Sequence, residues 1–317
     1  MNIFIDNVFK KIDNNQDIAI ISSQNPDLDG IACILAIKKL LEHVGHLKTT
    51  YAIYGKLQRE AKWTLDYLKI SLEMTTEIEN KRIVLVDASD KNSLPNQDYA
   101  KNVNAVLDHR LCNFTDFPQA TYWIESVGAC ATLVAELYMY FCIEPDQVIA
   151  SLLYGAILSN TANLHATNTT DRDRSILKWI QCFAKLPSTF VYDMFSAKSD
   201  FAEMSFMEII KDELSCTPMT YQGLQMRIPQ LEIVGVQSFL DKHMNGFRET
   251  FDIIKKAHDC DRVFLMIIDL EYAKTYFAFA SEYEKEIVCS RLQLQQNGTI
   301  WFSDSVILRK EVIKKMS

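Results

Sequence analysis

The feature of this chain that most constrains its fold is a series of polar motifs, each placed directly after an apolar run. NPDLDG at 25–30 follows IAIIS, VD at 86–87 follows IVL, LDHR at 107–110 follows VNAV, and ILSNT at 157–161 follows LLYGA. We interpret these runs as strands. In an open α/β sheet, side chains at the carboxyl ends of parallel strands converge on one crevice. The motifs therefore predict a single polar site built from segments far apart in the sequence.

The residues at these points are carboxylates and one imidazole: Asp27, Asp29, Asp87, Asp108 and His109. Such a set suits two hard or borderline divalent cations, and paired metals commonly cleave phosphate anhydrides and esters. For Asp27 and Asp29 the simpler alternative is a pair of helix caps, because Asp is favoured at that position. We favour ligands, since the two acids flank one leucine directly after a predicted strand.

Charge and hydropathy narrow the class of protein. The 33 Lys and Arg against 41 Asp and Glu leave a net charge of −8. A nucleic-acid-binding surface is normally basic, so no nucleic-acid partner is expected. No apolar stretch approaches the ~20 residues that cross a bilayer, so we expect no membrane association and a cytoplasmic location. A small anionic ligand stays compatible, because a metal can set the local charge of a site.

Strand-like and helix-like segments alternate as far as residue 186. The predicted strands are 18–22, 49–55, 82–89 and 103–109, and the predicted helices are 59–70, 170–186 and three that begin near Gly30, Gly128 and Pro145. This alternation predicts a doubly wound α/β domain at 1–186, with a parallel sheet covered on both faces. LPST at 186–189 marks the boundary. The alternating runs of 187–317 predict a smaller α/β domain with a mixed sheet.

The order of the motifs resembles the DHH phosphoesterase superfamily, and within it the manganese-dependent family II inorganic pyrophosphatases. The family motif HxNPDxDxI corresponds here to SSQNPDLDGI, and DHH corresponds to DHR at 108–110. GACATLVAELY at 128–138, GAILSNTANLHATNTTDRD at 155–173 and LRK at 308–310 follow in the family's order. The resemblance covers essentially the whole chain and implies its two-domain fold.

The resemblance also implies roles for single residues. It implies two Mn²⁺ or Co²⁺ ions bridged by Asp87, one held further by Asp27 and the other by Asp29 and His109. Asp108 would orient the histidine. Arg309 and Lys310 of the second domain would bind the terminal phosphate. The family usually pairs through its first domain, so a homodimer is expected by analogy.

Several positions depart from the family pattern, and they are positions to which the resemblance assigns metal or substrate binding. Ser23 stands in place of a histidine ligand, Arg110 in place of the second histidine of DHH, and Asn160 in place of a ligand aspartate. Leu214 stands where a substrate-binding lysine is expected. Asn160 still offers a carbonyl oxygen. Arg110 binds phosphate well, but its charge a few ångströms from a dication costs roughly a few kcal/mol at an effective dielectric of about 20.

We therefore predict a metal-dependent hydrolase of phosphoanhydride bonds that acts on pyrophosphate or short polyphosphate. Its cofactor would be one or two ions of Mn²⁺, Co²⁺ or Mg²⁺, with Asp87, Asp108 and Arg110 taking part in catalysis. One alternative is a degenerate relative that binds a phosphorylated ligand or a protein partner without turnover. A second is an exopolyphosphatase, which differs in substrate and not in chemistry.

Overall fold

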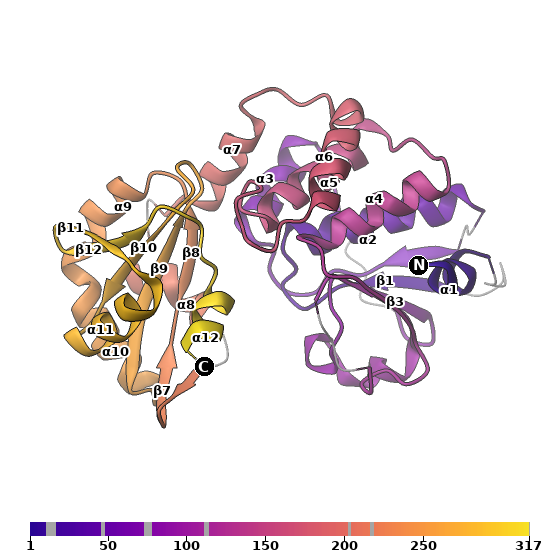
Figure 1. The fold of residues 1–317 in the computed structure, drawn as a ribbon. Helices are drawn as coiled ribbons and strands as arrows, with labels where there is room; N and C mark the ends of the chain where they lie inside the picture. Colours follow the sequence, from indigo (N-terminus) through magenta and orange to yellow (C-terminus); the bar gives the residue numbers. More distant parts are fainter. Residues whose placement is uncertain are drawn as a thin grey trace. The chain divides into compact units, whose positions relative to one another are not determined.

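The computed structural model describes residues 1–10, 17–45, 48–72, 78–110, 114–201, 204–215 and 219–316 (Figure 1). The chain divides into two compact units. The first comprises Met1–Leu164 and Asn168–Met194, and the second comprises His165–Thr167 and Phe195–Ser317. The predicted domain boundary after residue 186 lies inside the first unit, ahead of helix α7 (Phe190–Lys198).

A five-stranded sheet forms the centre of the first unit, in the order β2-β1-β3-β4-β5. Its strands are β1 (Ile18–Ile21), β2 (Thr49–Tyr51), β3 (Arg82–Val86), β4 (Val103–Asp108) and β5 (Thr121–Ile124). All four neighbouring pairs are parallel, which confirms the predicted sheet. Strand β5 was not predicted; it is a half-buried edge strand without a continuous apolar run. In a parallel sheet the carboxyl ends of β1, β3 and β4 lie along one edge.

One face of this sheet is covered by α-helices (Figure 1). They are α2 (Leu28–His43), α3 (Arg59–Tyr67), α4 (Cys130–Tyr140), α5 (Gln147–Asn160) and α6 (Asp171–Ala184). Helix α2 packs against both α4 and α5 and buries residues on most of its circumference. A helix that is buried on most sides removes more apolar surface from water than a surface helix does. This packing fixes the position of α2 and of its first turn.

The opposite face is covered without long helices. There the core includes Leu94 and Phe117, from the connections between β3 and β5, packed with Ala19 and Ile21 of β1. Two 3₁₀ helices, η2 (Lys91–Ser93) and η3 (Gln97–Asn102), lie in this segment. At the chain's start, α1 (Asn2–Ile5) contacts β5 and continues into the π-helix η1 (Asp6–Lys10). Both faces are thus buried as predicted, although the covering of the second face is irregular.

The apolar run before ILSNT was interpreted both as a strand and as part of the helix predicted from near Pro145. It forms helix α5, so the helix is confirmed and the strand is wrong, and Asn160 is the last residue of a helix. Asp146 caps this helix by accepting a hydrogen bond from the backbone N–H of Ile149. The capped run is 14 residues long, a length typical of helices and too long for a buried strand.

The second unit is built on a mixed seven-stranded sheet, as predicted. Its path is β11-β12-β10-β9-β7-β6, and β8 pairs in parallel with β9. The strands are β6 (Met219–Tyr221), β7 (Leu224–Arg227), β8 (Gln230–Ile233), β9 (Arg262–Asp269), β10 (Lys274–Phe279), β11 (Gln295–Asn297) and β12 (Ile300–Ser303). Alternate residues of β9 enter two separate apolar clusters: Leu265 and Ile267 one, Phe264 and Met266 the other.

Helices cover both faces of this second sheet. They are α8 (Phe206–Lys211), α9 (Val236–His243), α10 (Phe247–Ala257), α11 (Glu282–Leu292) and α12 (Arg309–Met316), with the 3₁₀ helices η4 (Asp212–Ser215) and η5 (Met244–Gly246). Arg309 and Lys310 open helix α12. Across both units, no helix of the described ranges is long and apolar enough to cross a membrane.

Candidate metal centre

Three carboxylates meet at the carboxyl edge of the first sheet. Asp87 directly follows β3, Asp108 ends β4, and Asp29 lies in the first turn of α2, just after β1. Strands β1, β3 and β4 are neighbours in the sheet. The three side chains lie in residues only 1–4% exposed. The predicted convergence of separate strand ends is therefore present in the structure for these residues.

Asp29, Asp87 and His109 form a group suited to a cation. Each offers one ligand atom, and these atoms all lie within 4.8 Å of one another. Two carboxylates and one imidazole suit Mn²⁺ and related divalent ions. Asp27, which the sequence also suggested as a ligand, is not a member of this group.

The ring of His109 is held in a defined orientation. Nδ1 lies 3.0 Å from the carbonyl oxygen of Val127, and a carbonyl can only accept, so Nδ1 carries the proton. Nε2 then presents a lone pair 3.6 Å from Oδ1 of Asp87. Burial, followed by the nearby charge of Arg110, lowers the pKa of His109. A neutral imidazole with its second nitrogen held by a carbonyl is the form that binds metals.

Asp29 is held by the beginning of helix α4. Its oxygens accept hydrogen bonds from the backbone N–H groups of Cys130 and Ala131, both at 2.8 Å. Cys33 approaches at 3.6 Å through its thiol. Burial, and then the charge of Asp27, raise the pKa of Asp29 to about 7, while the two amide hydrogen bonds act in the opposite direction. The helix N-terminus thus fixes the carboxylate in place and favours its charged form.

Asp87 adopts an unusual backbone conformation. Its φ of 49° lies in the left-handed region, which Asp tolerates better than most residues. Its backbone N–H donates to the carbonyl of Leu107 at 2.9 Å. Its own carbonyl accepts from Nη2 of Arg110. Burial raises the pKa of Asp87 well above its usual value, although the charge of Arg110 opposes this shift.

Arg110 bridges the two strand-end carboxylates. Its Nη2 lies 3.0 Å from Oδ1 of Asp87, and its Nε lies 3.1 Å from Oδ1 of Asp108. More than half of the Arg110 side chain, 55%, is nevertheless exposed to solvent. Although burial alone would lower the pKa of Arg110, the carboxylates of Asp87 and Asp108 raise it above its ordinary value. The guanidinium is therefore a permanent cation with one edge on the cluster and another open to a ligand.

Asp27 and Asn160 have other partners in this structure. Asp27 caps helix α2, accepting a hydrogen bond from the backbone N–H of Gly30 at 3.0 Å. The simpler alternative thus describes Asp27, while Asp29 faces the cluster. Asn160 donates from Nδ2 to Oδ2 of Asp29 at 2.5 Å. In this orientation the amide acts as a hydrogen-bond donor toward the position where it was expected to offer an oxygen.

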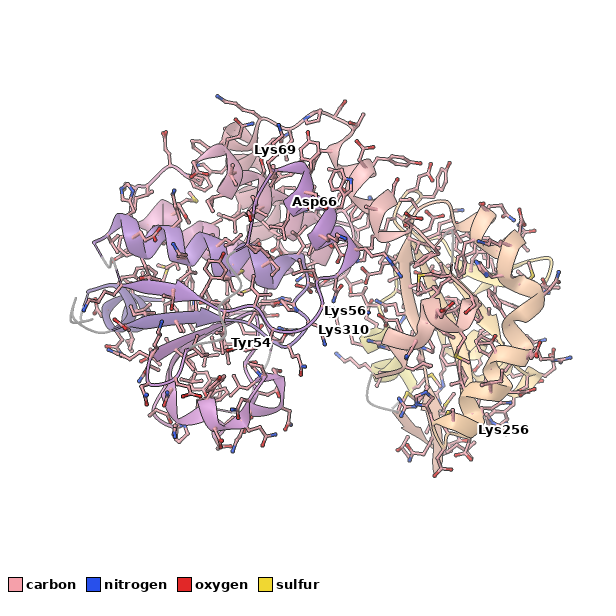
Figure 2. All side chains as sticks on the ribbon, turned by 180° about the vertical axis from the view of Figure 1, so that it is seen from behind. Tyr54, Lys56, Asp66, Lys69, Lys256 and Lys310 are labelled. Atoms are coloured by element: carbon pink, nitrogen blue, oxygen red, sulfur yellow. The ribbon has the colours of Figure 1, made fainter. Side chains whose placement is uncertain are left out.

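The residues that were expected to bind substrate in the second unit lie on α12 and η4. Arg309 is paired with Glu213 at 2.9 Å, and its Nη1 also donates to the carbonyl of Ile228 at 3.2 Å. Lys310 lies beside it in sequence at the start of α12 and is exposed (Figure 2). Leu214 is buried in the apolar core of this unit, so it fills space there and offers no charge.

The arrangement of these side chains indicates how many divalent cations they can bind. One ion fits Asp29, Asp87 and His109, because their ligand atoms are close together and the imidazole has the correct tautomer. Oδ2 of Asp108 is also buried without a hydrogen-bond partner, which leaves one further acceptor at this edge. A second ion does not fit equally well. In the motif that this chain resembles, two histidines stand at the positions of Ser23 and Arg110, and Asn160 donates a hydrogen bond to the candidate ligand Asp29.

The amide groups that hold Asp29 were not foreseen from the sequence. They belong to GACA at 128–131, a segment whose sequence indicates only its place in the motif order. Gly128 is needed there, because a Cβ would lie 2.5 Å from a methyl of Thr161 and 2.9 Å from Oδ2 of Asp173. Asp173 in turn accepts hydrogen bonds from Gly128 and Thr132. The TTDRD segment thus positions the start of α4 and, through it, Asp29.

Comparison with known proteins shows which families this chain is similar to. Residues 17–157 match the family described as "DHH family, N-terminal domain". The manganese-dependent inorganic pyrophosphatase of Methanothrix thermoacetophila is 21% identical over 257 residues, 80% of this chain and 82% of that protein. That of Bacillus subtilis (strain 168) is 24% identical over 304 residues, 94% and 97% of the two chains.

A solved structure matches at the level of the fold. A crystal structure from Methanococcus jannaschii, assigned to the family II inorganic pyrophosphatases, has a TM-score of 0.72 and 22% identity. The match covers 94% of this chain and 99% of the other. Residues 17–157 are therefore a DHH family domain. The chain as a whole is a distant relative of manganese-dependent inorganic pyrophosphatases, with the same two-sheet fold.

Proposed function

We propose that this chain hydrolyses the phosphoanhydride bond of pyrophosphate or short polyphosphate, with Mn²⁺, Co²⁺ or Mg²⁺ as cofactor. The observation that carries the proposal is the group formed by Asp29, Asp87 and His109, whose ligand atoms lie within 4.8 Å of one another. The neutral imidazole of His109, held by Val127, supports it. The substrate class comes from the distant relatives, which are pyrophosphatases by name.

Each residue of the first unit has a distinct role in this proposal. Asp29, Asp87 and His109 hold the cation, which when bound supplies a Lewis acid and lowers the pKa of an attacking water. Asp108 positions its neighbours, since Oδ1 accepts from the backbone N–H of His109 at 2.7 Å and from Arg110 at 3.1 Å. The exposed edge of Arg110 binds the substrate phosphate and offsets its charge.

The remaining assignments rest on the resemblance alone. Asp27 and Asn160 are proposed as further ligands, although one caps a helix and the other donates to Asp29. Arg309 and Lys310 are proposed as phosphate ligands from the second unit. Arg309 would have to exchange Glu213 for a phosphate, since the carboxylate occupies it here. Homodimer formation and a cytoplasmic location stay predictions.

A second function is favoured by one observation. Arg110 and Asn160 already satisfy Asp87, Asp108 and Asp29 with hydrogen bonds. Each of these three carboxylates thus has a side-chain hydrogen-bond donor without a metal, and the exposed guanidinium offers a place for an anion. The alternative is therefore a protein that binds a phosphorylated ligand or a protein partner without hydrolysis.

The two functions differ in phosphate release. The full chain, stripped with a chelator and resupplied with Mn²⁺ or Co²⁺, is expected to release phosphate from pyrophosphate and tripolyphosphate. Asp87→Asn should abolish this release, whereas the matched control Asp66→Asn, on the exposed side of α3 (Figure 2), should not. Release that increases with chain length would favour an exopolyphosphatase. No release above background, with thermal stabilisation by pyrophosphate that Arg110→Ala removes, would favour the binder.

The contribution of the second unit is tested separately. Lys310→Ala should raise the KM for pyrophosphate, because one positive charge is lost at the proposed phosphate position. Lys256→Ala removes an exposed lysine of α10 in the same unit (Figure 2) and serves as the control. Equal kinetics for the two variants would remove Lys310 from the proposal and leave the metal centre unaffected.

A further inference from the structure

The guanidinium of Arg110 lies where two buried carboxylates need a counter-charge. Asp87 and Asp108 end neighbouring strands, and their residues are 4% and 1% exposed. Two such charges at one sheet edge repel each other and are costly to bury without a partner. Arg110 contacts one oxygen of each, at 3.0 and 3.1 Å. A single rigid fork thus bridges the carboxylates of β3 and β4, as a bridging cation would.

The amide of Asn160 likewise stabilises a third carboxylate, that of Asp29, by donating a hydrogen bond to it. Asp29 already accepts two backbone hydrogen bonds from the start of α4. Asn160 adds a third strong donor at 2.5 Å. A carboxylate in that place would instead repel Asp29. Both replacements relative to the family motif therefore supply positive or donor groups to carboxylates that would otherwise depend on metal.

The charges of the cluster limit how many ions it holds. Asp29, Asp87, Asp108 and the nearby Asp27 carry four negative charges when ionised, and Arg110 carries one positive charge. One divalent cation leaves a net charge of −1. A second would make this largely buried site net positive, next to a guanidinium that cannot lose its proton.

We propose that this centre binds a single divalent cation, at Asp29, Asp87 and His109, and that Arg110 permanently takes the place of a second ion. The inference deepens the proposed function, on which it depends only for cation binding at these residues. It has two measurable consequences. The full chain takes up one equivalent of Mn²⁺, and its folded state does not require metal.

The first test counts ions. Native mass spectrometry and electron paramagnetic resonance of the full chain, titrated with Mn²⁺ after chelation, should show one bound ion with the spectrum of an isolated Mn²⁺. The variant Ser23→His/Arg110→His/Asn160→Asp restores the donors of the family motif and should take up two, with an exchange-coupled spectrum. Two coupled ions in the unmodified chain would overturn the inference, and so would the absence of any bound ion.

The second test measures the melting temperature of the metal-free protein. Arg110→Ala, in chelator, should lower the melting temperature by on the order of 5 °C, because two buried carboxylates lose their cation. Added Mn²⁺ should restore most of this loss. Arg248→Ala removes an exposed arginine from α10 and should change little. If Arg110→Ala melts at the unmodified temperature in chelator, Arg110 does not act as a counter-charge and the inference fails.

These outcomes separate the inference from the proposed function, because neither test measures turnover. One bound Mn²⁺ without phosphate release would support the single-ion site and contradict the hydrolase. Phosphate release with two bound Mn²⁺ ions would support the hydrolase and contradict the single-ion site. Arg110→Lys keeps the charge but not the fork and provides a folded comparison if Arg110→Ala does not accumulate.

Discussion

Nδ1 of His109 lies 3.0 Å from the carbonyl oxygen of Val127, and this contact determines which ring nitrogen faces the carboxylates. With Nδ1 protonated, Nε2 carries the lone pair on the side of Asp87. A histidine that is orientated in this way is ready to bind a cation without rotation of its ring. The relationship connects the loop before α4 with the end of β4.

Substitution of His109 tests this geometry. His109→Asn should lower the affinity for Mn²⁺ at least about tenfold, because one of three ligands is lost. Isothermal titration calorimetry on the chelated protein measures the change. His258→Asn, at an exposed position just after α10, is the control. Unchanged affinity in His109→Asn would place the cation elsewhere.

Asn160→Asp should change stability and metal affinity in opposite directions. In the metal-free protein at pH 8, where Asp29 is ionised, a carboxylate replaces the amide that donates to Asp29 at 2.5 Å, so two like charges meet. We expect a loss of about 1–3 kcal/mol in the free energy of unfolding, measured with urea in chelator. Mn²⁺ affinity should rise about tenfold or more, because a charged ligand replaces a neutral one. If Asn160→Asp changes neither the free energy of unfolding nor the affinity for Mn²⁺, Asn160 does not contact the site.

The ionisation of Asp29 gives a pH dependence. Burial, followed by the charge of Asp27, raises the pKa of Asp29 from its ordinary 3.8 to about 7 in the metal-free fold. The folded state therefore keeps a proton that the unfolded chain has released. This contribution to stability is fully present below the unfolded pKa and is lost as the pH rises through about 7.

The comparison that isolates this group is between the unmodified chain and Asp29→Asn in chelator. Relative to that variant, the unmodified chain should be more stable at pH 5 than at pH 8. Urea unfolding at both pH values measures the difference. A difference that is the same at pH 5 and pH 8 would mean that Asp29 titrates near its ordinary value.

Substitution of Asp173 tests the hydrogen bonds that position the start of α4. Asp173 is 0% exposed and accepts hydrogen bonds from Gly128, Thr132 and Thr170. Asp173→Ala leaves these donors buried without a partner, so we expect a loss of about 3 kcal/mol in the free energy of unfolding. Asp171→Ala, exposed in the same first helical turn, should cost far less. Equal losses would contradict the role assigned to Asp173.

The strand-end positions of Asp87 and Asp108 could be predicted from the sequence, because near-continuous apolar runs mark buried parallel strands. The distinction between Asp27 and Asp29 could not. Both acids fit a helix cap, and only the start of α2 at Leu28 makes Asp27 the cap. The edge strand β5 was missed because its residues are mostly half-buried and lack the pattern that identified the others.

Side-chain partners were the least predictable part. The contact of Asn160 with Asp29 depends on how the end of α5 packs against the start of α2, which no local pattern encodes. The pairing of Arg309 with Glu213 depends in the same way on tertiary packing. Arg110 was recognised from the sequence as a departure from the motif. Its bridge between two strand ends became visible only in three dimensions.

The most direct test of the account is anomalous scattering from crystals of the full chain soaked in millimolar Mn²⁺. We expect a peak at bonding distance from Asp29, Asp87 and His109, with Arg110 still in contact with Asp87 and Asp108. A map without a peak among these three side chains, in crystals that show Mn²⁺ at other positions or nowhere, would contradict the metal centre from which the proposed function follows.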